Sequence, residues 1–237
     1  MDILIVIIAT AFIQSLFGVG VLLFGTPLLL LLGYPFMESL LILLPISASI
    51  NALQIIKDYK YINIKIYKQI LIFTVPFIVL FLFIISKVDI DINIAVGLFL
   101  IFIALKEHIV FIQSFFTTIL SYNKLFYSTM GMVHGLTNLG GALLTAKVFH
   151  TNLNKYEKRA TIAMSYMTFA VFQIITILFL DNNFGATNFW YIIVGVIVYV
   201  GINKLFFHKM SEHKYDKLFS FFLLISGISL VLKGLIW

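Results

Sequence analysis

The stretch GVGVLLFGTPLLLLLG at residues 18–33 interrupts an apolar run that otherwise extends from Ile3 to Leu32. Glycine inside an α-helix costs about 1 kcal/mol and proline about 3 kcal/mol relative to alanine, so this stretch favours two half-helices with a broken centre. Irregular backbone at membrane depth is tolerated only where protein buries it or where it lines a water-filled cavity. The stretch is therefore a candidate binding site, although glycines in membrane helices also allow neighbouring helices to approach closely.

A second interrupted apolar run, GLTNLGGALLTAK at residues 135–147, occupies the corresponding place in the other half of the chain. A shift of about 120 residues aligns Gly20 with Gly140, and duplicated units of this kind are typical of secondary transporters. The second broken run therefore favours the interpretation that residues 18–33 form a binding site rather than a helix-packing contact. The predicted division is a first repeat over residues 1–106, a connector over 107–123 and a second repeat over 124–237.

The composition predicts an integral membrane protein. Of the 237 residues, 62% are hydrophobic and 11% are charged, whereas soluble domains carry about 25% charged residues. The apolar runs are too long for a transmembrane β-barrel, whose alternating segments contain about ten residues, so helices must supply the spans. The net charge of +6 resides in short loops, which argues against a nucleic-acid partner. We also expect no cleaved signal peptide, because Met1 and Asp2 supply no basic n-region.

The 16 basic residues predict how the chain crosses the membrane. If all eight apolar segments crossed, these residues would divide seven to nine between the two sides, against the positive-inside rule. If the two broken runs return to their own side as re-entrant hairpins, one side keeps only Lys87 and Lys233 and the other side holds 14 basic residues. Each repeat then has three crossings, so the repeats are inverted and both termini lie outside. The basic loops at residues 57–68 and 147–159 share the inner side.

A second topology satisfies the same charge rule. If the connector also crosses the membrane, nine crossings leave Lys87, Lys124 and Lys233 opposite the other 13 basic residues. The connector is short for a span of about 20 apolar residues, and it contains polar side chains such as Gln113 and Ser114. The hairpin topology is therefore favoured, and both topologies require inverted halves.

Facing half-helix N-termini would offer unsatisfied N–H groups and positive dipole ends to an anion. The predicted substrate-binding residues are Gly18, Gly20, Gly25, Thr26, His134, Thr137, Asn138, Gly140, Gly141 and Thr145. At Gly20 and Gly140 we expect open space, so that leucine would block transport without disturbing the packing of helices. Alternatively, the threonine hydroxyls could bond to the backbone of their own helix, and Asn138 could serve as the cap of a half-helix without contacting a ligand.

Other chemistry has little support in the sequence. The chain contains no cysteine, and its five histidines lack the spacing of a metal site. No serine lies in a G-x-S-x-G motif. We therefore predict no catalytic residues, no metal and no cofactor. Lys147 could attract anions toward the site or extend to the membrane interface.

The spacing of Gly18, Gly20, Pro27 and Gly33, repeated more loosely around Gly140, resembles the TauE/SafE sulfite exporter family, also called the TSUP permeases. The resemblance covers nearly the whole chain. It implies a multi-pass protein of the bacterial inner (plasma) membrane that transports sulfite, organosulfonates or related small anions. The chain departs from the family pattern at Val21, Leu22 and Lys147. These departures affect the prediction of the substrate more than the prediction of the fold.

The combined prediction is an all-α polytopic membrane protein with two inverted four-segment repeats. Each repeat contains a broken, re-entrant helix pair and three transmembrane helices. The predicted function is secondary transport of a small anion by alternating access at a midplane site between the repeats. Open alternatives are a carrier of another organic acid or of a neutral solute, and a membrane scaffold that transports nothing. The expected partners are the anionic substrate and the lipid bilayer, and a homo-oligomer is compatible with the sequence.

Overall fold

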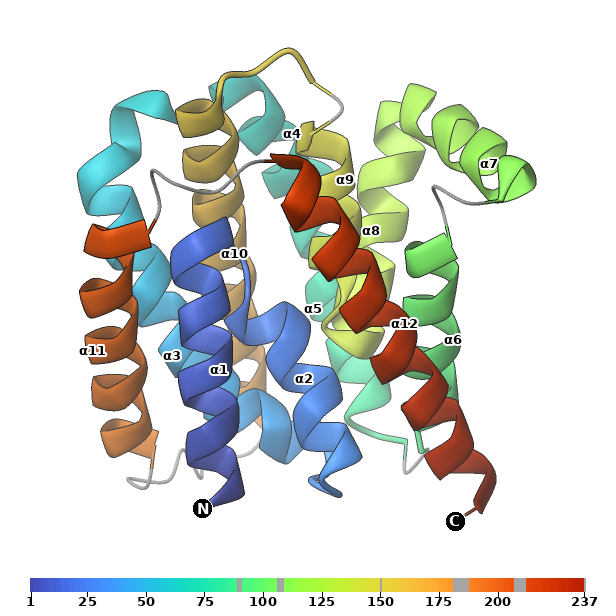
Figure 1. Ribbon diagram of the computed structural model, residues 1–237. Helices are drawn as coiled ribbons and strands as arrows, with labels where there is room; N and C mark the ends of the chain where they lie inside the picture. Colours follow the sequence, from blue (N-terminus) through green and yellow to red (C-terminus); the bar gives the residue numbers. More distant parts are fainter. Residues whose placement is uncertain (89–90, 106–108, 150, 181–187, 207–211, 237) are drawn as a thin grey trace.

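Every element in the described part of the computed structural model is a helix (Figure 1). The structure describes residues 1–88, 91–105, 109–149, 151–180, 188–206 and 212–236. The elements are α1 (Asp2–Phe17), α2 (Val21–Leu31), α3 (Phe36–Asp58), the 3-10 helix η1 (Tyr59–Tyr61), α4 (Ile64–Phe73), α5 (Val75–Ile85), α6 (Asn93–Ala104), α7 (Val110–Ser121), α8 (Asn123–Thr137), α9 (Gly140–Phe149), α10 (Lys155–Leu180), α11 (Asn188–Phe206) and α12 (Glu212–Ile236). The predicted boundary between the first repeat and the connector lies outside the described residues.

Three helical stretches among these residues are long and apolar enough to cross a membrane, judged by length and composition. They are Phe36–Tyr61, Ile64–Ile85 and Lys155–Leu180. Shorter apolar helices pack around them. This architecture agrees with the predicted all-α membrane class.

The predicted break in the first apolar run lies between α1 and α2. Gly18 follows α1 with a φ of 78° and donates its N–H to the carbonyl oxygen of Gln14 at 2.8 Å. Helices often end at a glycine in this left-handed conformation, because glycine has no Cβ that would clash with the backbone. Pro27 lies inside α2 without ending it. The broken run is thus confirmed, and Gly18 is the residue that turns the chain.

The second apolar run breaks between α8 and α9. Asn138 has a φ of 61° and is the only non-glycine residue with a positive φ in the described part of the chain. Its N–H donates to the carbonyl oxygen of His134, four residues earlier, at 2.8 Å. In the first break the N–H of Gly18 donates in the same way to the carbonyl oxygen of Gln14. Asparagine tolerates this conformation better than most residues because its short polar side chain can bond locally.

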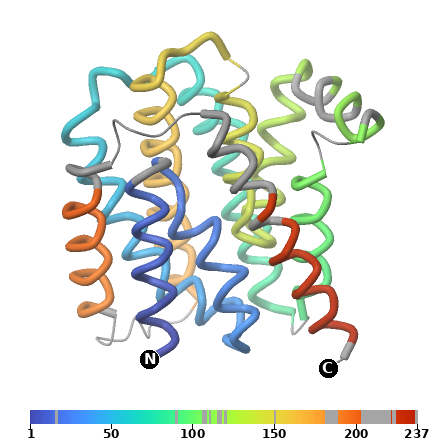
Figure 2. Tube along the Cα trace, in the orientation of Figure 1, coloured from blue at the N-terminus to red at the C-terminus, as the bar shows by residue number. Residues whose placement is uncertain are grey.

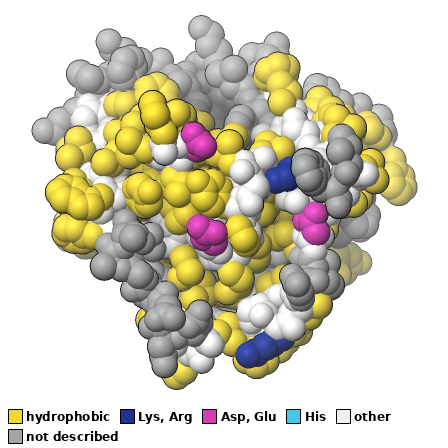
Figure 3. Space-filling view, turned by 90° about the horizontal axis from the view of Figure 1, so that it is seen from below, with side chains coloured by type: hydrophobic (Ala, Val, Ile, Leu, Met, Phe, Trp, Pro, Cys, Tyr) yellow, Lys and Arg dark blue, Asp and Glu magenta, His cyan; other side chains and the backbone are white. Residues whose placement is uncertain are grey.

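The two broken helix pairs open toward opposite ends of the molecule (Figures 1 and 2). α1 begins and α2 finishes at the lower end, where both termini lie, whereas α8 begins and α9 finishes at the upper end. α7 stays at the upper end and does not reach the lower one. Viewed from below, the coloured side chains are mostly hydrophobic, with few lysines or arginines (Figure 3).

The predicted basic loop over residues 147–159 is partly helical, which corrects the sequence analysis. α9 continues to Phe149, and α10 begins at Lys155. The side chain of Asn154 accepts hydrogen bonds from the N–H groups of Tyr156 and Glu157, and the Glu157 carboxylate accepts the N–H of Asn154 at 2.9 Å. This reciprocal capping starts the helix. Arg159 therefore lies in α10 rather than in a loop.

Close approach of backbones holds α6 against α12. A Cβ atom added to Gly97 would lie 2.7 Å from the carbonyl oxygen of Gly227, and the reverse distance is also 2.7 Å. Small residues at such contacts allow helices to pack in a membrane, where no hydrophobic effect drives them together. Gly97 is therefore a packing residue.

Gly97→Leu is expected to destabilise the protein by about 1–3 kcal/mol, the usual range for forcing extra methylene groups into a packed contact. Thermal unfolding in detergent measures this loss. Gly201→Leu is the matched control, since nothing lies within 4 Å of a Cβ added at Gly201. Equal melting temperatures for the two variants would contradict the packing role.

Candidate functional site

A chain of buried polar side chains joins the two broken helix pairs. Asn138 Nδ2 donates to Thr26 Oγ1 at 2.8 Å, and Gln173 Nε2 donates to Asn138 Oδ1 at 3.3 Å. The ring nitrogen Nε2 of His134 lies 3.1 Å from Gln173 Oε1. All four side chains are buried. We call Thr26, Asn138, Gln173 and His134 the central polar chain.

Four different parts of the fold supply the central polar chain. Thr26 belongs to α2, His134 to the last turn of α8, and Asn138 to the break that follows it, while Gln173 comes from the long helix α10. Three of these residues were predicted from the sequence, and the structure brings them together. Gln173 was missed, although an amide inside an apolar run is a usable signal because polar groups are costly in a membrane.

The hydrogen bonds assign the protonation of the His134 ring. Gln173 uses its nitrogen to donate to Asn138, so its oxygen Oε1 faces His134. The Nε2 atom of His134 must then carry the proton, and Nδ1 is left as an acceptor. Nδ1 is buried and has no hydrogen-bond partner among the described residues. An unpaired buried acceptor costs about 1–3 kcal/mol, which is compatible with a place for a ligand donor.

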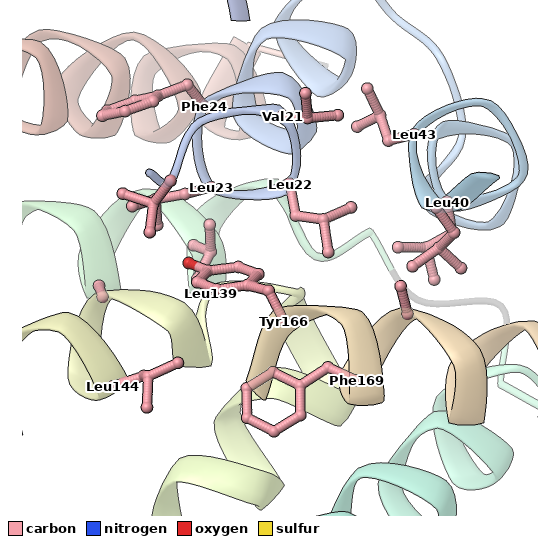
Figure 4. Close-up of a cluster of buried hydrophobic side chains, with 14 of the residues drawn as sticks. Val21, Leu22, Leu23, Phe24, Leu40, Leu43, Leu139, Leu144, Tyr166 and Phe169 are labelled. Carbon is pink, nitrogen blue, oxygen red and sulfur yellow. The ribbon is translucent and has the colours of Figure 1, made fainter. Parts of the chain in front are cut away.

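Aromatic and aliphatic side chains surround the central polar chain. The ring of Phe169 lies 4.7 Å from that of His134, centroid to centroid, and the Tyr166 ring meets His134 edge-on at 6.4 Å. Figure 4 shows Tyr166 and Phe169 extending from α10 near Leu22 and Leu139. Such an apolar environment strengthens the hydrogen bonds inside it.

Gly20 and Gly140 do not offer the open space that the sequence analysis expected. A Cβ atom at Gly20 would lie 2.6 Å from the carbonyl oxygen of Thr10. At Gly140 it would lie 2.5 Å from His134 Cβ and 2.5 Å from the carbonyl oxygen of Met130. Each glycine allows the two helices of its own broken pair to approach each other closely, so leucine at either position would disturb the packing of that pair. Their contact with a substrate stays a prediction.

The other predicted glycines lie against neighbouring side chains. A Cβ at Gly25 would lie 2.7 Å from Leu43 Cδ2, and one at Gly18 would lie 3.1 Å from Arg159 Cγ. At Gly141 an added Cβ would overlap the phenol group of Tyr166. Gly141 thus makes room for an aromatic side chain at the beginning of α9.

Thr137 and Thr145 are not members of the central polar chain. The hydroxyl of Thr137 donates to the carbonyl oxygen of Val133 at 2.7 Å, and that of Thr145 donates to the carbonyl oxygen of Gly141 at 2.8 Å. These bonds within one helix are the ones that threonines commonly make in membrane helices. Lys147 donates to Asn123 Oδ1 at 2.8 Å, which connects the outer ends of α9 and α8.

A side-chain oxygen occupies the N-terminus of α2 in this structure. The N–H of Val21 donates to Gln14 Oε1 at 2.9 Å, and Gln14 Nε2 donates to Asn51 Oδ1 at 3.0 Å. Asn51 in turn donates to Ser47 Oγ at 3.1 Å. Gln14 therefore takes the position at a helix N-terminus that an anion oxygen would favour, and the sequence analysis had missed it.

Apolar helices arranged around two helix breaks that share a buried polar chain are features of a polytopic membrane protein, and broken helices of this kind are typical of secondary transporters. The chain belongs to the sulfite exporter TauE/SafE family, because the family model described as "Sulfite exporter TauE/SafE" matches residues 3–230. The resemblance inferred from the glycine pattern is thus confirmed. Members of this family are membrane transporters rather than enzymes. Among curated proteins and solved structures, none matches this chain.

Proposed function

We propose that the protein is an inner-membrane secondary transporter that carries sulfite, an organosulfonate or a similar small anion by alternating access. The observation that carries this proposal is the central polar chain, which links Thr26 of one broken pair to Asn138 of the other. A membrane scaffold has no need for unwound backbone and linked polar groups in its interior. A carrier needs both where its two halves meet.

The central polar chain has the chemistry to bind an oxyanion. The amide nitrogens of Asn138 and Gln173 and the hydroxyl of Thr26 are donors that could turn toward ligand oxygens. Hydrogen bonds to a charged acceptor are about twice as strong as those between neutral groups, so an anion could replace the present partners. The Nδ1 acceptor of His134 would then suit a proton carried by the ligand, as on bisulfite or a protonated acid.

We further propose that the repeats are inverted and that the chain makes six crossings with two re-entrant hairpins. Three parallels between the halves support this arrangement. Gly18 and Asn138 both turn the chain in the left-handed conformation. One turn before each break, Gln14 and His134 bond to an amide on the next long helix, and the two hairpins open at opposite ends.

The proposed topology predicts that tags at Met1 and Trp237 both report from outside the cell. Cysteines introduced at Tyr61 and Tyr156 should both react with a labelling reagent on the cytoplasmic side. The rings of these two residues are stacked with their centroids 5.4 Å apart, so both positions lie at the same end of the molecule. The native chain contains no cysteine that would interfere. If the N-terminal tag reported from the cytoplasm and the C-terminal tag from outside the cell, the result would instead support nine crossings.

Uptake into proteoliposomes tests the proposed function. The panel comprises sulfite, thiosulfate, taurine, sulfoacetate and lactate, and we expect saturable transport of sulfite or an organosulfonate. Transport of lactate alone would select the organic-acid alternative. Failure to transport every anion in the panel by a well-folded protein would reject the proposal.

A further inference from the structure

The hydrogen bonds of the central polar chain all point in one direction. The Thr26 hydroxyl donates to the carbonyl oxygen of Leu22 at 2.8 Å, so its oxygen accepts from Asn138. Asn138 then uses its own oxygen to accept from Gln173, whose oxygen accepts from the ring of His134. The chain ends at His134 Nδ1, which is buried and has no hydrogen-bond partner among the described residues. One end of the central polar chain is therefore a lone pair.

A proton fits this lone pair without any rearrangement. His134 is fully buried, and the centroid of the Phe169 ring lies 4.7 Å from that of its own ring. A proton needs no room for a further molecule in such a packed region. Both nitrogens of an imidazolium are donors, so a proton on Nδ1 leaves the bond from Nε2 to Gln173 intact. The central polar chain can thus take up one proton and keep every bond that it has.

His134 is also the buried residue that suits a change of charge near neutral pH. No aspartate or glutamate is buried in the described part of the chain. Arginine stays protonated and tyrosine stays neutral at physiological pH, whereas histidine ordinarily titrates between about pH 5 and pH 8. The described interior therefore offers a transported proton one histidine and no carboxylate.

The titratable group that faces His134 is Tyr166 of α10, whose ring meets the imidazole edge-on at 6.4 Å between centroids. The sequences of α2 and α5 contain no titratable residue. The charged residues of the other helices around it lie toward the upper end of the molecule (Figure 1): Lys65 and Lys68 of α4, Lys124 of α8, Lys147 of α9, and residues 155 and 157–159 of α10. Lys124 precedes His134 by ten residues, which is about 15 Å along a helix. No charge on these helices therefore lies beside the imidazole.

We propose that His134 Nδ1 is a proton-binding site that couples transport to the proton, so that each anion crosses together with one proton. This inference rests on the proposed transport function and names its coupling ion. An imidazolium without a counter-ion is costly in an apolar interior, so the empty site keeps His134 neutral. An anion held by the central polar chain supplies the opposite charge, and the two ligands strengthen each other's binding by the same factor. The proton comes from water on the side of entry and returns to water on the other side.

The pH dependence of anion binding tests this coupling in detergent. Thiosulfate and taurine are the first probes, because neither gains nor loses a proton between about pH 6 and pH 8, so a proton taken up must bind to the protein. Binding should remove about one proton per protein from a weakly buffered solution, and the dissociation constant should rise about tenfold for each pH unit. Sulfite titrates in this range, and its own titration cancels when two protein variants are compared.

His134→Gln is the informative variant. Its amide nitrogen can still donate to Gln173, but it cannot take up a proton, so we expect anion binding that no longer depends on pH. Tyr166→Phe is the control, since it removes the neighbouring hydroxyl and should keep the uptake of one proton. If Tyr166→Phe lost the proton while His134→Gln kept it, the proposed site would be wrong. Should His134→Gln fold poorly, the wild-type proton count still decides, because a count of zero overturns the proposal.

Proteoliposomes with an internal pH indicator separate this proposal from the transport function. Lowering the external pH by one unit should accelerate uptake about tenfold at anion concentrations below KM, and the interior should acidify as the anion enters. Uptake of an anion by the wild-type protein without acidification would overturn the proton site and leave the transport function standing. If the wild-type protein carries no anion of the panel, the transport function itself fails.

Discussion

Asn138→Gly is expected to reduce anion uptake at least about tenfold while the protein still folds. Glycine adopts the left-handed conformation of Asn138 without strain, so the break between α8 and α9 remains. The amide that joins Thr26 to Gln173 is lost, and removal of one preorganised donor often costs more than a factor of ten. Uptake rates in proteoliposomes, together with melting temperatures, measure the two effects separately.

Asn138→Ala is the matched variant for the backbone contribution. Alanine lacks the amide and also resists a positive φ, so we expect the same loss of uptake with a lower melting temperature than Asn138→Gly. If Asn138→Gly transported at the wild-type rate, Asn138 would serve only to end α8. The central polar chain would then lose its place in the proposed mechanism.

Gln173→Leu is expected to lower both stability and transport. The substitution leaves Asn138 Oδ1 and His134 Nε2 without their partner in a buried region, and each unpaired group costs about 1–3 kcal/mol. Compensation by neighbouring groups in a membrane can reduce the loss to about 1 kcal/mol per hydrogen bond. Thermal unfolding in detergent measures the loss of stability.

Gln54→Leu is the control for this prediction, because it makes the same chemical change on another long helix. Gln54 is equally buried but has no hydrogen bond among the described residues, so its replacement should not lower the melting temperature. The comparison isolates the contribution of the hydrogen bonds from that of side-chain volume. Equal destabilisation by both variants would mean that packing around these glutamines, rather than bonding, sets stability.

The sequence by itself determined the class of protein and the places where its helices break. Composition decides membrane residence because a chain with 62% hydrophobic residues cannot be solvated as a soluble domain. The break after α1 was predictable because glycine acts locally: the backbone at Gly18 adopts a conformation that few other residues accept. The glycine spacing also sufficed to indicate the family, which the match over residues 3–230 confirmed.

Only the tertiary structure decided which polar groups meet and what the glycines do. Thr26 and Asn138 are 112 residues apart in sequence, and no local pattern states that their side chains bond. Gly20 and Gly140 were expected to border open space, but the folded chain brings backbone within 2.6 Å of an added Cβ. Arg159 belongs to a basic stretch in the sequence, yet capping by Asn154 starts α10 ahead of it and packing against α11 buries it. Contacts of this kind depend on how helices pack across the whole chain, which short-range sequence patterns do not encode.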